Sequence, residues 1–144
     1  MIIWNPWHGS LQAKRRKRRA VPTAEIVIKN KIMTELEKLL AGELYDYSDA
    51  EIAQLHGKAY YLSLKINNNL SFDNLEEMKL LQKELLPNMD ETSTVLPPFR
   101  CDLGFRIKIG RNVTVNQNCT FLDNAPIEIG DNCLIGPDCH LGYG

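Results

Sequence analysis

The last 38 residues of the chain repeat one pattern every six residues, and this repeat constrains the fold more than any other feature. Each hexad begins with a small or branched apolar residue and carries a second apolar residue two positions later. It closes on Asn, Asp or Gly, which tolerate turns. Six hexads follow one another, with Ala125 and Pro126 inserted after the third: Ile107–Asn112, Val113–Asn118, Cys119–Asn124, Ile127–Asn132, Cys133–Asp138 and Cys139–Gly144.

A period of six suits a short strand followed by a tight corner, and three such hexads can close one coil of a three-sided prism. The apolar residues at the first and third positions of a hexad lie on the same face of its strand, so that face is buried. We therefore predict a parallel β-helix over residues 97–144, incomplete at its C-terminus. The residues expected at its corners, because they tolerate unusual dihedral angles, are Gly110, Gly130, Gly136, Asn112, Asn118, Asn124 and Asn132.

Residues 33–96 carry signals that predict three short helices. Thr34–Glu37 has the sequence of a capping box, and Gly42 is a suitable stop for the helix that follows it. Ser48–Glu51 and Asp73–Glu76 are expected to open the second and third helices, and Pro87 to end the third. Together with the strands, these helices place the chain in the α+β class, with a small helical domain before the β-helix.

Residues 1–32 differ in composition from the rest of the chain. They carry eight Lys or Arg and one Glu, for a net charge of +7, whereas residues 33–144 carry nine basic and seventeen acidic residues, for −8. Six consecutive basic residues, Lys14–Arg19, could bind nucleic-acid phosphates. The alternative, which we favour, is that residues 1–32 form a disordered or extraneous extension and that the domain begins at Met33.

Other features narrow the classes of protein further. No apolar run approaches the ~20 residues of a membrane span, so we expect a cytoplasmic protein without a membrane partner. Cys119, Cys133 and Cys139 each stand at the inward first position of a hexad, where a small apolar residue fits. The sequence has no Cys-x-x-Cys pair. We therefore expect free thiols and no metal site.

Several motifs outside the repeat resemble those of one family, the maltose and galactoside O-acetyltransferases. The resemblance covers residues 33–144, and its motifs, in chain order, are Met33–Asp49, Pro97–Gly104, Asn116–Cys119, Leu122–Asp123 and Ile129–Asn132. It implies a homotrimer of left-handed β-helices, each with a small helical domain. It also implies an enzyme that transfers acetyl from acetyl-CoA to a sugar hydroxyl.

The resemblance also suggests site residues. Asn116 would contact acetyl-CoA or the acceptor, and Asp102, Asp123 and Asp46 would contact the acceptor sugar; each could instead be an ordinary corner, turn or cap residue. The family's general base is a histidine, and the hexad register puts it two residues beyond Gly144.

His140 is not this base, because it stands at an outward position of its hexad. We therefore expect a sugar O-acetyltransferase chain that lacks its catalytic residue and turns over little. The alternatives are a non-catalytic remnant that trimerises or binds sugar, and a nucleic-acid binder acting through its basic segment.

Overall fold

The computed structural model describes residues 33–69 and 72–142. The expectations for residues 1–32, including nucleic-acid binding through Lys14–Arg19, lie outside the described residues, as do those for Gly144.

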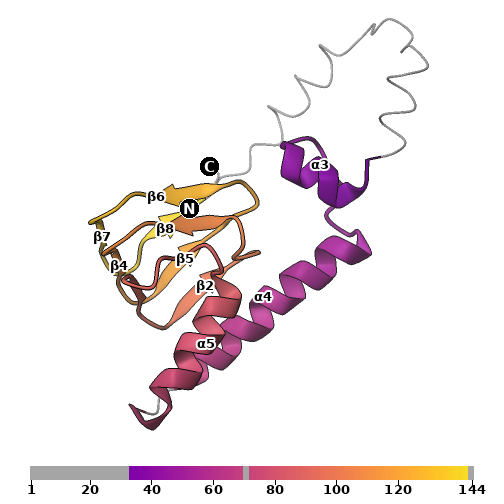
Figure 1. Cartoon of the computed structure of the whole chain (residues 1–144). Coiled ribbons are helices and arrows are strands. Elements are labelled where there is room, and N and C mark those ends of the chain that lie inside the picture. The colour runs from indigo at the N-terminus through magenta and orange to yellow at the C-terminus, as the bar shows by residue number, and fades with distance from the viewer. Residues whose placement is uncertain (1–32, 70–71, 143–144) are drawn as a thin grey trace, which may run out of the picture.

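The strands of the described residues form three parallel sheets. One sheet has the order β1 (Thr94–Val95), β4 (Thr114–Val115), β7 (Leu134–Ile135); the second β2 (Phe99–Cys101), β5 (Cys119–Phe121), β8 (His140–Leu141); the third β3 (Ile107–Ile109), β6 (Ile127–Ile129). Thr94 pairs with Thr114, and Thr114 with Leu134, so one coil takes 20 residues. That is three hexads plus the inserted pair. The three sheets wrap around one core and make a three-sided coil (Figure 1).

A strand begins each complete hexad, or begins one residue into it, as the repeat predicts. However, β1 lies within residues 33–96, ahead of the first hexad and of the expected start of the β-helix. It joins the coil because Thr94 N–H and Leu96 N–H donate to the carbonyls of Val113 and Val115, 2.9 Å away in each case. Backbone pairing of this kind does not require the hexad pattern.

The corners differ from the expectation in one respect. The non-glycine residues with positive φ in the described chain are Asn112, Asn118, Asn132 and Asp138, with φ between 53° and 62°. All stand at the last position of a hexad, where Asn and Asp tolerate the left-handed region. Gly110, Gly130 and Gly136 do not have positive φ. The expectation for these glycines was wrong, because the corner turns two residues after them.

The helices are α3 (Glu35–Ala41), α4 (Ala50–Asn68) and α5 (Leu75–Leu85), with a 3₁₀ turn at Phe72–Asn74. The Thr34–Glu37 capping box and the left-handed Gly42 at the end of α3 are confirmed. Asp49, not Ser48, caps α4. Ser48 is unavailable because both its hydroxyl and its backbone N–H donate to Asp46 Oδ1.

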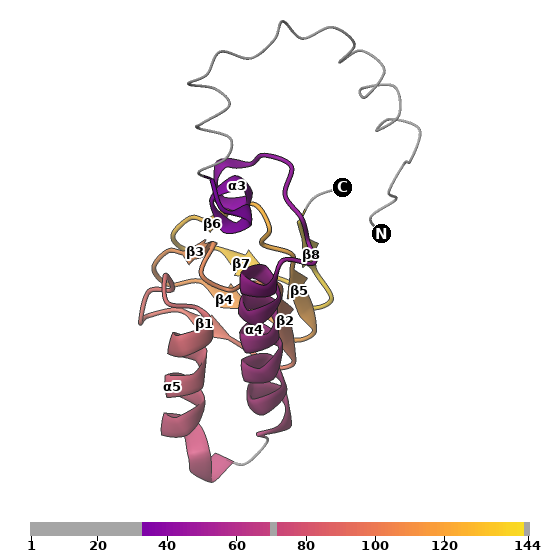
Figure 2. The ribbon, with the colours of Figure 1, turned by 90° about the vertical axis from the view of Figure 1, so that its right-hand side faces the viewer.

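Helices α4 and α5 run side by side and cover the lower end of the coil, formed by β1, β2 and β3 (Figure 2). Buried side chains of the two helices and of the coil form one core, with Ile66, Leu85, Phe99 and Ile107 among them. A smaller cluster of Leu39, Ile52 and Leu103 holds α3 and the start of α4 against the turn after β2.

Two helix side chains also bond to the backbone at this lower end. The amide of Asn67 donates to Phe99 O over 2.9 Å and accepts from Phe99 N over 2.8 Å. Gln82 Nε2 donates to Val95 O over 2.7 Å. The helices therefore satisfy backbone groups of edge strands that would otherwise be open to another chain. No helix of the described residues is long and apolar enough to cross a membrane.

Candidate functional site

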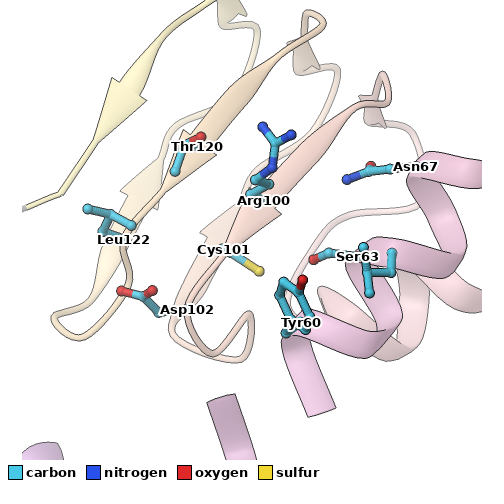
Figure 3. A pocket seen from close by; sticks show the side chains of 9 residues that line it. Tyr60, Ser63, Asn67, Arg100, Cys101, Asp102, Thr120 and Leu122 are labelled. Atoms are coloured by element: carbon cyan, nitrogen blue, oxygen red, sulfur yellow. The ribbon is translucent and has the colours of Figure 1, made fainter. Parts of the chain in front are cut away.

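A pocket of about 240 Å³ lies between α4 and the outer face of strands β2 and β5 (Figure 3). Its wall combines cationic, anionic, hydroxyl and thiol groups with apolar ones. The lining residues are Tyr60, Ser63, Leu64 and Asn67 of α4, Arg100 and Cys101 of β2, Asp102 just after it, and Thr120 and Leu122 in and after β5. A pocket of this size suits a small polar ligand rather than a large apolar one.

Asp102 is the titratable acid of this pocket and one of the predicted site residues. Its Oδ2 accepts a hydrogen bond from Asn124 Nδ2 over 2.7 Å. Burial raises the pKa of Asp102, the nearby His56 lowers it, and the carboxylate of Asp123 raises it. Asp102 is only partly exposed, so part of this carboxylate remains accessible to a ligand.

Two buried polar atoms in the neighbourhood of Asp102 have no hydrogen-bond partner among the described residues. They are Nε2 of His56 and Oδ1 of Asn124. His56 is oriented from its other side, where Nδ1 lies 3.1 Å from the Tyr47 hydroxyl. Since nearly all buried polar atoms in proteins are paired, these two indicate a place for a hydroxyl group, of a ligand or of water.

Arg100 supplies a positive charge at another part of the pocket wall. The strand register puts Arg100 beside Thr120 and Thr120 beside His140, so the three residues form one column on the outer face of the sheet. Arg100 forms no ion pair with the described residues. The pocket can therefore hold a molecule with several hydroxyls, which donate to Asp102 and accept from Arg100.

The structure corrects the expectation for Asp123. This residue is fully buried, with 0% exposure. Its Oδ1 accepts from the backbone N–H groups of Asp102 and Leu103, and its Oδ2 from those of Gly104 and Arg106, over 2.7 to 3.3 Å. The carboxylate organises the turn that carries Asp102, and it has no surface with which to contact an acceptor.

The other two predicted site residues lie elsewhere. Asn116 follows β4, and its Oδ1 accepts from Gln117 N over 2.8 Å. Asp46 lies in the connection between α3 and α4, where its carboxylate binds Ser48 and its pKa is lowered by those hydrogen bonds. Neither residue lines the pocket. Of the four predicted residues, the structure brings Asp102 and Asp123 together and puts only Asp102 at the pocket.

Sequence reasoning missed Arg100 and Asn124 as site residues. A signal for Arg100 exists, because alternation within Phe99–Cys101 points its side chain outward, next to Thr120 in the following coil. Asn124 was expected only as a corner residue. Its contact with Asp102 spans 22 residues and depends on the stacking of two coils.

Two other features were considered as sites. A larger pocket of about 410 Å³ lies between α5 and residues 86–97, but it contains no histidine or cysteine and its only carboxylate is Glu91. Within residues 33–69 and 72–142, no group of three or more His, Cys, Asp or Glu side chains is placed to hold a metal ion.

Comparison with known proteins gives a consistent family. Nodulation protein L of Rhizobium meliloti is 41% identical over 104 residues, which are 72% of this chain and 56% of that protein. A hexapeptide-repeat-containing acetyltransferase from Vibrio cholerae, solved with acetyl coenzyme A, is 44% identical with a TM-score of 0.68, covering 75% of this chain and 57% of that one.

A maltose O-acetyltransferase from Clostridium difficile is 33% identical with a TM-score of 0.71 and covers the same shares, 75% and 57%. No protein-family model matches the chain. The chain therefore belongs to the hexapeptide-repeat acetyltransferases that include the maltose and galactoside O-acetyltransferases. It spans a little over half the length of the relatives it matches.

Proposed function

We propose that this chain forms the acceptor side of an acetyl-CoA-dependent O-acetyltransferase whose acceptor is a sugar. The observation that carries the proposal is the pocket wall at Asp102, where a partly exposed carboxylate lies near two buried polar atoms without partners. A sugar hydroxyl both donates and accepts hydrogen bonds, so it can satisfy a carboxylate and an imidazole nitrogen at the same time.

Acetyl transfer from a thioester to a hydroxyl needs an oriented acceptor, a base for its proton and a donor for the developing oxyanion. In the proposal, Asp102 accepts from the acceptor and Asn124 holds that carboxylate in place. Arg100 and Thr120 contact the far side of the sugar. Asn116, which does not line the pocket, is kept as a proposed contact for acetyl-CoA.

The base is not assigned to either histidine of the described residues. His140 is exposed on the outer face of β8, and His56 Nε2 is buried outside the pocket lining. Acetyl-CoA itself is treated as a co-substrate. Burial raises the pKa of the Cys101 thiol, with Asp123 and Asp102 adding to the shift, so this thiol is not an alternative nucleophile.

Acceptor binding and turnover are best tested separately. Titration with maltose, followed by NMR or calorimetry, should detect binding that falls about tenfold in Asp102→Asn, equivalent to ~1.4 kcal/mol. Asp138→Asn is the matched control, since Asp138 is an exposed corner residue outside the pocket. Equal affinities for wild type and Asp102→Asn would contradict the proposal, and so would a failure of every sugar in a panel to bind.

Turnover is measured as free thiol released from acetyl-CoA in the presence of maltose. Because no described histidine fits the base, we expect turnover by this chain to stay near background even where maltose binds. Turnover within a few fold of an intact relative would show that a base is present after all. Release without acceptor is the control for simple hydrolysis.

The proposal also predicts a pH dependence. Burial raises the pKa of Asp102, so its carboxylate protonates at a higher pH than an ordinary aspartate and then loses acceptor capacity. Maltose affinity should therefore weaken as pH falls through this raised pKa.

Stability should change in the opposite sense. A raised folded-state pKa means that Asp102 favours the fold below its unfolded pKa, and this contribution is lost as pH rises through the folded pKa. Asp102→Asn should flatten both profiles. An affinity in wild type that is constant down to the range of ordinary aspartates would contradict the assigned role.

Three finer features belong to the same proposal. We propose that the coil winds left-handed and that the working enzyme is a homotrimer located in the cytoplasm. Exposed apolar side chains support association, among them Leu44 at 79% and Leu134 at 77%. Sedimentation velocity at several concentrations tests the trimer, and a monomer at every concentration would contradict it.

A further inference from the structure

Two of the cysteines lie in neighbouring coils on the inner side of the same sheet. Strands β5 and β8 are parallel, with Thr120 opposite His140 and Phe121 opposite Leu141. Continuing this register back by one residue puts Cys119 opposite Cys139, and Thr120 N–H donates to Cys139 O over 3.0 Å. Both cysteines belong to the same core cluster. Their side chains therefore point the same way from adjacent strands.

We propose that Cys119 and Cys139 form a redox-sensitive pair, in which a low-molecular-weight disulfide such as oxidised glutathione converts the two thiols into a reversible disulfide between coils. Neighbouring strands are spaced by about 4.8 Å. This spacing lies inside the Cα–Cα range of roughly 4.4–6.8 Å seen for disulfides. The proposal does not depend on the assigned acetyl transfer.

The two thiols differ in accessibility, which sets the order of reaction. Cys139 is partly exposed, whereas Cys119 is fully buried. Burial raises the pKa of Cys119, and contact with the thiol of Cys139 adds to this shift. Since the thiolate is the reactive form, Cys139 reacts first and Cys119 second.

The reaction balances in two exchanges. Cys139 loses its proton and attacks one sulfur of oxidised glutathione, forming a mixed disulfide and releasing one glutathione, which takes up the proton. Cys119 then loses its proton and attacks Cys139 Sγ, forming the bond between coils and releasing the second glutathione in its thiol form. Two protein thiols are oxidised and one glutathione disulfide is reduced to two thiols.

The disulfide should be easy to reverse. In a parallel, in-register pair the two Cβ atoms are about as far apart as the strands, whereas disulfides favour a Cβ–Cβ distance near 3.8 Å. The bond therefore forms only if the strands shift, and strained disulfides are the more readily reduced ones.

The remaining cysteines are placed differently. Cys133 precedes β7 in another sheet, and its thiol donates to Asp131 O over 3.7 Å. Cys101 pairs with Phe121 in the ladder and lines the pocket beside Ser63 (Figure 3). Neither lies opposite a cysteine in the next coil, so both should stay free when the folded chain is oxidised.

The test is incubation of the folded chain with oxidised glutathione, followed by blocking of free thiols and digestion after Arg111 and Glu128. This digestion separates Cys119, in residues 112–128, from Cys133 and Cys139, in residues 129–144. We expect the two peptides to be linked in wild type and in Cys133→Ser, and unlinked in Cys139→Ser. A mixed disulfide should precede the linked form, and reduced glutathione should restore the thiols.

The contrary outcomes are equally definite. The proposal is overturned if all thiols remain free, if the reaction stops at a mixed disulfide on Cys139, or if the link persists in Cys139→Ser. It also fails if the link forms only after unfolding in urea, because the strand register would then not be its cause. Circular dichroism before and after oxidation verifies that the chain stays folded.

Discussion

The two ends of the coil carry the same pattern of residues but differ in what covers them. At the lower end, helices α4 and α5 pack on the core, and Val95 and Phe99 are each 2% exposed. At the upper end, formed by β6, β7 and β8, the inward residues Ile135 and Leu141 are only partly buried. Their counterparts one coil below, Val115 and Phe121, are 0% exposed.

This difference teaches that the hexad pattern fixes the direction of a side chain but not its burial. Alternation along a strand is a local property, so it survives at the upper end unchanged. Burial needs a neighbour on both sides, as in other stacked repeats. Four pairs of substitutions at equivalent positions of the two regions measure how much each neighbour contributes.

The largest effect is expected for Phe121→Ala compared with Leu141→Ala. Phe121 is fully buried, and its ring meets that of Phe99 edge to face with centroids 5.1 Å apart. Its truncation should cost about 4 kcal/mol of unfolding free energy, because a large cavity forms inside the coil. Leu141→Ala should cost less than about 2 kcal/mol, since the side chain is partly exposed already. Urea denaturation measures both, and equal losses would contradict the comparison.

The second pair compares two aspartates that accept backbone N–H groups. Asp123→Asn should cost roughly 3 kcal/mol, because an amide offers one acceptor oxygen where four buried donors now find two. Asp131 accepts from Arg111 N over 2.7 Å but is exposed, so Asp131→Asn should change stability by less than about 0.5 kcal/mol. Chemical denaturation provides the measurement. A small loss for Asp123→Asn would mean that the turn does not depend on its charge.

These aspartates also illustrate what the sequence could predict about the site. Asp102 and Asp123 are both acidic residues in turns after strands, and the resemblance assigned both to the acceptor. Which of the two faces the pocket depends on how one coil stacks on the next, since Asp123 reaches back 17 to 21 residues to its donors. Local pattern does not contain that information.

The fold was more accessible to prediction than the site. The capping box at Thr34 and the strands of the hexads follow from contacts within a few residues. The first strand, β1, was missed because its partner lies 20 residues later and its own sequence lacks the repeat. The bonds of Asn67 to Phe99 span 32 residues and could not be inferred from helix periodicity either.

The third pair tests two glycines at equivalent positions of successive coils. A Cβ on Gly110 would lie 2.3 Å from Asp131 Oδ1 and 2.9 Å from Asp131 N, whereas one on Gly130 would meet nothing within 4 Å. Gly110→Ala should therefore cost about 1–3 kcal/mol through overpacking. Gly130→Ala should be neutral or stabilise by up to about 1 kcal/mol through loss of unfolded-state entropy. Thermal denaturation decides, and similar effects at both glycines would show that corner conformation, rather than close approach, sets their roles.

The smallest effect is expected for the charged residues on the outside of the same two strands. Lys108 Nζ lies 2.8 Å from Glu128 Oε1, but the two side chains are 68% and 69% exposed. The hydrogen bond to Glu128 raises the pKa of Lys108, yet water and salt screen such a pair. Lys108→Gln should leave the urea midpoint unchanged within error, at low salt as well as at high salt. If it instead destabilised the chain as much as Gly110→Ala, the coils would be held together by their outer charges as much as by the inward column of apolar residues.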